Sequence, residues 1–209
     1  QRLFEGNIVA VKLAVSTAIV MGVVAMVVGT VAGYAGGLTD TVLMSYVDIQ
    51  QTFPVFILLL LLISLYGASL FLIILLYGVF GWEGTARLVR SEALQRTEEA
   101  YSRAAEAAGA SKLWVVRRHI IPNVSSTVIT AATLSIPVFI LGEAALSFLG
   151  FGDPGTFSWG RTINAGRSDI DSAWWISTIP GLFLFLTVLA FNFVGDALRD
   201  AIDPRSDSG

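Results

Sequence analysis

Two carboxylates lie inside strongly apolar stretches of the 209-residue sequence and are candidates for chemistry. Asp48 lies in SYVDIQQTF and Glu143 in VFILGEAALSF. A carboxylate in apolar surroundings is costly, so such residues usually line a water-filled path or support a contact between helices. For Asp48, an interfacial position without a role is the alternative. For Glu143, path lining and helix bracing stay open, and a protonated form is one option.

The second candidate is the only long polar segment between strongly apolar ones, TEEAYSRAAEAAGASKLWVVRRHIIPN at residues 97–123. Gly109 predicts a break between two short helices. Thr97 and Ser111 are suitable N-caps for these helices, and Pro122 is predicted to end the second. Ala100, Ala104, Ala107 and Ala108 then form a face with almost no side chain.

Composition limits the chemistry that this chain can perform. Hydrophobic residues make up 55% of the chain, charged residues 14%, and the mean hydropathy is +0.73, so most of the protein is predicted to lie in lipid. The absence of cysteine excludes disulfides, iron–sulfur clusters and cysteine-ligated zinc, and the single histidine, His119, excludes a histidine-rich metal site. The net charge of -3 gives no sign of a nucleic-acid partner. No Gly-x-x-x-x-Gly-Lys-Ser/Thr motif is present to hold ATP phosphates, so we expect no cofactor on this chain.

The apolar pattern predicts an all-α membrane protein with five transmembrane helices, at residues 7–34, 41–66, 70–89, 125–151 and 174–194. Pro54 is predicted to kink the second helix, because the segment after it is only about 20 Å long and too short to cross. Residues 152–172 are predicted to form a polar loop, with Trp159, Trp174 and Trp175 at its edges in an aromatic belt. Gly29 and Gly33 have the spacing of a close helix contact, although glycines facing lipid are the alternative.

The distribution of basic residues predicts the orientation. Five spans place residues 97–123 and the C-terminal tail on one face with nine of the thirteen Lys and Arg residues, against four on the other face. The excess predicts that residues 97–123 and the C-terminus are cytoplasmic. The first predicted span then starts outside, so we expect a sixth span and an N-terminal tail before Gln1.

The segment AAEAAGASKLWVVRRHIIPN resembles the EAA loop of ABC-importer permease subunits, whose pattern is EAA, three residues, Gly, nine residues, Ile, one residue and Leu-Pro. Arg103 stands at the Glu position and His119 at the Ile position. Both departures are typical of the dipeptide/oligopeptide branch, in which the loop reads YxxAAxxxGAS and ends RHxxPN. The stretches AGYAGGLTD, GWEGTARLVR, EAALSFLGFG and PGLFLFLTVLAFNFVGDALRDAIDPR also resemble this branch, in particular its C-type subunit, a binding-protein-dependent transport system inner membrane component.

The resemblance implies that residues 1–209 form one permease domain that imports dipeptides or oligopeptides, with residues 97–123 as its EAA coupling loop. It implies partners: a second permease subunit, two ATPase subunits that carry ATP and Mg, and an extracytoplasmic peptide-binding protein that contacts residues 152–172. It places the chain in the cell membrane. The residues that it implies for contact with the ATPase are Tyr101, Arg103, Ala104, Ala105, Ala108, Gly109, Ala110, Ser111, His119 and Pro122.

Other functions share parts of this pattern. Permeases of the same fold carry nickel, glutathione or oligosaccharides. An ion-coupled secondary transporter would need a charged site at the midplane, for which only Glu143 and Asp48 are candidates. An intramembrane enzyme would need paired acids, a Ser–His pair or metal ligands, and His119 lies in the polar segment. We therefore predict a transport subunit that is not itself an enzyme.

Overall fold

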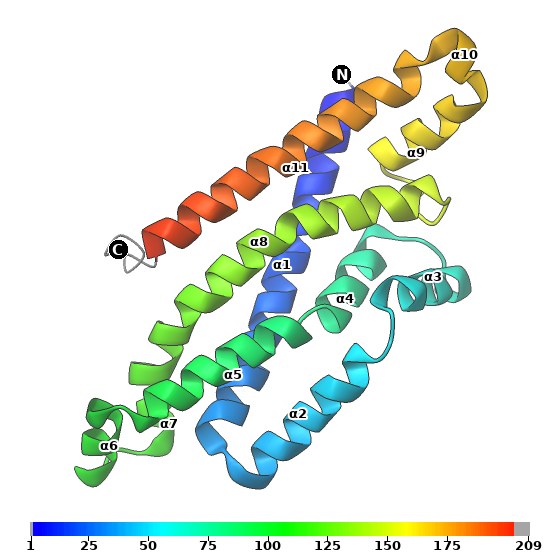
Figure 1. The fold of residues 1–209 in the computed structure, drawn as a ribbon. Coiled ribbons are helices and arrows are strands. Elements are labelled where there is room, and N and C mark those ends of the chain that lie inside the picture. The colour runs from blue at the N-terminus through cyan, green and yellow to red at the C-terminus, as the bar shows by residue number, and fades with distance from the viewer. Residues whose placement is uncertain (1, 203–209) are drawn as a thin grey trace. The chain divides into compact units, whose positions relative to one another are not determined.

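A computed structural model describes residues 2–202, and the elements found in this range are all helical (Figure 1). The described residues fall into two compact units. Unit 1 is built from 1–20, 54–78 and 133–209, and unit 2 from 21–53 and 79–132. The predicted coupling segment, 97–123, lies wholly in unit 2.

Among the described residues, three helices are long and apolar enough to cross a membrane: Glu5–Ala35 within α1 (Arg2–Ala35), Lys112–Phe148, and Trp175–Ile202, which is α11. The second of these comprises α7 (Lys112–Val115), η1 (Val116–Ile120) and α8 (Ile121–Phe148). Two pairs of helices with short breaks pass the same test, α2 (Gly37–Gln51) with α3 (Val55–Tyr66) and α4 (Leu70–Phe80) with α5 (Glu83–Glu98). Counting each pair as one span gives the five predicted spans.

The prediction that Pro54 kinks a continuous helix is wrong, because Pro54 precedes α3 as its N-cap. α2 stops at Gln51, and the N–H groups of Thr52 and Phe53 donate to carbonyls three residues back, at 3.1 and 3.2 Å. The proline ring disfavours helical geometry at Phe53, and Pro54 itself is extended with ψ 102°. The chain therefore leaves the helix here and begins a new one.

The predicted span at 70–89 is also interrupted, at Gly81 and Trp82. The break frees the Val79 carbonyl, which accepts hydrogen bonds from Trp82 Nε1 and Gln50 Nε2, both at 2.7 Å. Such replacement partners allow a helix to break at membrane depth. α5 then continues through Thr97, whose hydroxyl donates to the Ala93 carbonyl at 2.7 Å, so Thr97 is not the predicted N-cap.

Unit 2 packs around α5. Its buried core comprises Val89, Ala93, Ile120, Val124 and Val128, which come from α5, η1 and α8. The α1 helix approaches the α5 backbone so closely that a Cβ on Gly29 or Gly33 would lie 2.5 Å from a carbonyl oxygen of α5. The close helix contact predicted from these glycines is confirmed.

Unit 1 contains more helix than the sequence suggests, because 152–172 is not simply a polar loop. It includes α9 (Trp159–Ala165), η2 (Gly166–Asp169) and the start of α10 (Ile170–Ala173). Trp159 is only 2% exposed, with its ring 6.4 Å from that of Phe183 in α11, so its predicted place in an aromatic belt is wrong. Apolar packing of α9 against α11 explains both differences.

Candidate functional site

The turn at Gly109 separates the two helical parts of the predicted coupling segment. α6 (Ala100–Ala107) ends in a Schellman motif, in which Gly109 N–H donates to Glu106 O at 2.9 Å and Ala110 N–H to Ala105 O at 3.0 Å. Gly109 has φ +89°, the left-handed conformation that glycine adopts without steric cost. The residue type is therefore required by the turn that the structure contains.

Two hydrogen bonds attach α6 to the rest of unit 2. The buried Ser102 hydroxyl donates to the Arg96 carbonyl of α5 at 2.7 Å, and the Tyr34 hydroxyl of α1 donates to Glu106 Oε1 at 2.7 Å. The opposite face of α6 is open, with Arg103 and Ala104 exposed. Because alanine carries only a methyl group, a partner can approach this backbone closely.

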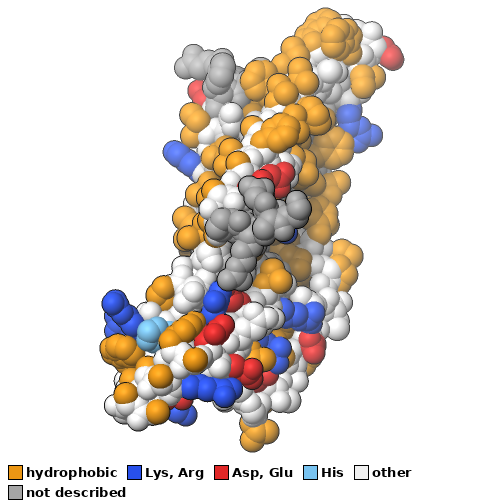
Figure 2. Space-filling view, turned by 60° about the vertical axis from the view of Figure 1, so that its left-hand side comes forward, with side chains coloured by type: hydrophobic (Ala, Val, Ile, Leu, Met, Phe, Trp, Pro, Cys, Tyr) orange, Lys and Arg blue, Asp and Glu red, His pale blue; other side chains and the backbone are white. Residues whose placement is uncertain are grey.

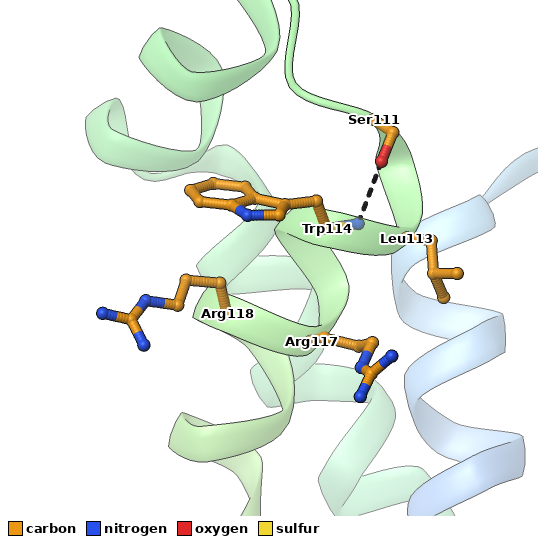
Figure 3. A pocket seen from close by; sticks show the side chains of 5 residues that line it. All are labelled: Ser111, Leu113, Trp114, Arg117 and Arg118. Carbon is orange, nitrogen blue, oxygen red and sulfur yellow. Dashed lines mark hydrogen bonds between the residues drawn. The ribbon is translucent and has the colours of Figure 1, made fainter.

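The second helical part begins as predicted at Ser111, whose Oγ accepts a hydrogen bond from Trp114 N–H at 3.3 Å. Leu113 and Trp114 follow with 67% and 49% of their surface exposed. Together with Arg117 and Arg118 they line a hollow of about 350 Å³ (Figure 3). In Figure 3, Trp114 and Arg118 extend to one side of the helix and Leu113 and Arg117 to the other.

His119 joins the two helical parts through its aromatic neighbours. Its ring centroid lies 5.2 Å from that of Tyr101 in α6 and 5.3 Å from that of Trp114. Asn123 Nδ2 donates to the His119 carbonyl at 2.6 Å, which holds the main chain here. The histidine therefore packs between aromatic rings, and in Figure 2 it appears in pale blue with basic side chains on the same surface.

Pro122 does not end the second helix, contrary to the prediction. The chain passes through the π-helical turn η1, where Ile121 N–H donates to Val116 O, five residues back, and then continues as α8. A proline near the start of a helix lacks only an N–H that would be difficult to satisfy there, and the wider π turn relieves its clash with the preceding turn. Pro122 is exposed on this continuous helix.

The structure thus places the predicted coupling residues in one continuous segment of unit 2, which runs from α6 through the Gly109 turn, α7 and η1 to the start of α8. We name its exposed part the loop surface; it comprises Arg103, Ala104, Ala107, Ala108, Gly109, Leu113 and Trp114. Ala105, Ala110 and His119 are partly buried behind it, while Tyr101 and Ser111 are exposed at its edges.

The two carboxylates singled out from the sequence lie elsewhere. Asp48 in α2 forms an ion pair with Arg87 in α5, and both side chains are largely exposed. Glu143 in α8 is buried in unit 1, where the Ser147 hydroxyl, one turn further along the helix, donates to its Oε1 at 2.6 Å. Neither belongs to the loop surface.

Sequence reasoning missed several contributors. The exposed Leu113 and Trp114 were overlooked, although each is followed four residues later by an arginine, a spacing that places both pairs on shared helix faces. Tyr34 was also missed; a tyrosine at the end of an apolar span needs a hydrogen-bond partner, here Glu106. Among residues 2–202, no cluster of His, Asp and Glu side chains is arranged to hold a metal ion.

The family described as "Binding-protein-dependent transport system inner membrane component" matches residues 25–208. The chain belongs to this family. The prediction of a permease of this family is confirmed, and the chain is accordingly an inner membrane component of such a transport system.

Three relatives of this permease carry peptide-transport names. The oligopeptide transport system permease protein OppC of Haemophilus influenzae is 35% identical over 96% of the chain, and OppC of Escherichia coli K12 is 37% identical over 98%. The dipeptide transport system permease protein DppC of Bacillus subtilis is 36% identical over 98% of the chain. The chain spans 65%, 68% and 64% of the length of these relatives, respectively.

Solved structures share the fold. A chain of the MetNI methionine ABC transporter in an inward-facing conformation has a TM-score of 0.76 at 19% identity, covering 97% of this permease and 96% of that chain. A chain of an amino acid ABC transporter has a TM-score of 0.67 at 18% identity, covering 96% and 94%. The all-helical permease fold is therefore shared well beyond recognisable sequence similarity.

Proposed function

We propose that this chain is the transmembrane permease subunit of an ATP-driven, binding-protein-dependent importer of dipeptides or oligopeptides. The observation that carries the proposal is the similarity, over nearly the whole chain, to permeases named for oligopeptide and dipeptide transport. The path for the peptide would form between this chain and a second permease subunit. Specificity for peptides, rather than nickel, glutathione or oligosaccharides, is part of the proposal.

The loop surface is the proposed contact with an ATPase subunit. The sequence carries no phosphate-binding loop, so ATP and Mg would be held by two separate ATPase subunits. Ala104 and Ala108 let a groove of the ATPase approach the α6 backbone, and Trp114 offers the large, exposed aromatic side chain that often dominates an interface. Arg103 can pair with an acidic residue at the edge and set the orientation more than the affinity.

The proposed orientation follows from these contacts. The loop surface faces the cytoplasm with the ATPase, and residues 152–172 face outward, where an extracytoplasmic peptide-binding protein would deliver its cargo. Closure of the ATPase pair around ATP would move the loop surface, and the spans joined to it would change between inward-open and outward-open states.

Uptake by the reconstituted complex tests this function. The permease is assembled in liposomes with the second permease, the ATPase subunits and the binding protein, and accumulation of a labelled dipeptide, a labelled pentapeptide, nickel, glutathione and an oligosaccharide is measured. We expect peptide accumulation that needs hydrolysable ATP and the binding protein. Accumulation driven by an ion gradient without ATP would instead identify a secondary transporter, and ATP-driven uptake of only a non-peptide would overturn the substrate.

A further inference from the structure

The helix α2 has very little apolar contact within unit 2. Of its fifteen residues only Val47 and Gln50 are buried. Four of its large apolar side chains are more than half exposed: Leu38, Val42, Tyr46 and Ile49. Val47 is fully buried and Leu43 and Met44 are half-buried, so apolar packing holds only part of α2 against the rest of the unit.

Polar contacts with α5 take its place. Arg90 Nε and Nη2 donate to the two carboxylate oxygens of Asp40, each at 2.5 Å. A paired, bidentate arginine–carboxylate contact is both strong and directional. The side chains are only 34% and 19% exposed, so this pair is shielded better than an ordinary surface ion pair.

Three further contacts extend this connection along α2, one to α5 and two to residues that precede α5. Arg87 pairs with Asp48, two turns beyond Asp40 on α2. At the far end Gln50 donates to the Val79 carbonyl at 2.7 Å, and the Tyr46 and Trp82 rings stack with their centroids 6.3 Å apart. The two helices run antiparallel, and contacts with α5 and the residues just before it reach from Asp40 in the first turn of α2 to Gln50 in its last turn.

The α5 helix is in turn bound firmly to the element that carries the loop surface. Arg96 O accepts the Ser102 hydroxyl of α6, and the Thr127 hydroxyl of α8 donates to Glu92 of α5. The apolar core joins α5 to η1 and α8. A displacement of the loop surface must therefore move α5, which is joined to α2 by the ion pairs of Arg90 and Arg87, while Gln50 of α2 donates to Val79 near the end of α4.

We infer that Arg90 and Arg87, with Asp40 and Asp48, are positioning residues for transport, because they couple α2 to the ATPase-driven movement of α5. The inference rests on the proposed function of the loop surface and adds a route by which its movement reaches a span with an exposed apolar face. The two pairs act on α2, not on ATP hydrolysis. Loss of the pairs should therefore separate hydrolysis from uptake.

The test uses the assembled transporter and two variants. Arg87→Ala/Arg90→Ala removes both pairs, and Asp40→Arg/Arg90→Asp exchanges the charges of the shielded pair. Arg199→Ala, an exposed arginine of α11, is the matched control for loss of a guanidinium. Two quantities are measured for each: peptide taken up per ATP hydrolysed, and the distance between spin labels on α2 and α5.

The labels are placed by Val42→Cys and Leu88→Cys. Both positions are exposed, at 65% and 57%, and the chain has no cysteine of its own to interfere. Partner subunits without reactive cysteines complete the complex. A rigid connection gives one narrow distance distribution that stays the same with and without nucleotide.

We expect the double alanine variant to broaden this distribution and to lower uptake per ATP about tenfold, within the range typical of coupling between sites. ATP hydrolysis by the double alanine variant should persist. Asp40→Arg/Arg90→Asp should recover part of the uptake per ATP, and the Arg199→Ala control should match the wild type. If the wild-type transporter takes up peptide with ATP and the double alanine variant matches it in label distance or in uptake per ATP, the inference is overturned and the proposed function stands. A wild-type complex without ATP-driven uptake overturns the proposed function, and the inference falls with it.

Discussion

The left-handed turn at Gly109 allows the sharpest single-residue prediction. Its φ of +89° is a conformation in which an L-residue costs about 1–2 kcal/mol, and a β-branched residue is strongly disfavoured. A free-energy change of this size corresponds to roughly a 5- to 30-fold shift of an equilibrium. Gly109→Val should therefore reduce the population of the loop geometry by at least about fivefold. Apart from the two neighbours in the chain, no atom of the described residues lies within 4 Å of the Cβ position, so the effect is one of backbone conformation and not of a clash.

The assay is ATP-driven peptide uptake, combined with the amount of ATPase subunit that co-purifies with the permease. Gly84→Val is the matched control, because Gly84 lies in α5 with ordinary helical φ and equally open space at its Cβ position. We expect the Gly109→Val variant to insert normally into the membrane, to lose most of its peptide uptake and to co-purify with less ATPase subunit. The Gly84→Val variant should match the wild type in both quantities. Uptake by Gly109→Val within twofold of the wild type would refute the reasoning.

Substitutions at four further positions test the loop surface, its supports and the packing of unit 2. Tyr34→Phe removes the hydrogen bond to Glu106 and should lower the free energy of unfolding in detergent by about 0.5–1.5 kcal/mol. Less ATPase subunit should co-purify with this variant. An unchanged free energy of unfolding would mean that the hydrogen bond does not stabilise the protein. Gly33→Val forces a side chain into the α5 backbone and should destabilise the permease by about 1–3 kcal/mol, whereas a normal melting temperature would contradict the close approach of α1 and α5. Ser111→Ala removes an N-cap worth about 0.5–2 kcal/mol, while Ser111→Asp should preserve it, and equal uptake by the two variants would contradict a role for this cap. Ala104→Glu should prevent close docking and abolish uptake without affecting membrane insertion, and normal uptake would contradict the proposed contact.

Much of the architecture follows from local sequence rules. The apolar lengths predict the spans, and glycine spacing predicts a close helix contact, although not that its partner is α5. Gly109 predicts the turn, and Ser111 predicts the N-cap that follows it. Each of these features depends on a few neighbouring residues, so a single sequence is sufficient. The resemblance of residues 97–123 to an EAA loop depends on the same local pattern.

The errors arose where distant residues decide the local structure. The break before α5 depends on Gln50, which donates to the freed Val79 carbonyl from another helix. Pro122 stays inside a helix because the π-helical turn before it makes room, and no local composition signals such a turn. Trp159 is buried because α9 packs against α11, and the contacting residues, Trp159 and Phe183, are not neighbours in the sequence. Ion pairs such as Asp40 with Arg90, fifty residues apart, were beyond prediction for the same reason.

If the loop surface docks an ATPase subunit, its residues must lie close to that subunit in the assembled transporter, and site-specific cross-linking measures this proximity. Because the chain contains no cysteine, Ala108→Cys provides a unique reactive site on the loop surface, and Trp174→Cys provides an exposed control in unit 1. A short cysteine-to-lysine cross-linker is applied to the assembled transporter with and without ATP. We expect a cross-link from residue 108 to an ATPase subunit, with a yield that changes when ATP is added, and no cross-link from residue 174. No cross-link from residue 108, or an equal cross-link from both positions, would contradict it.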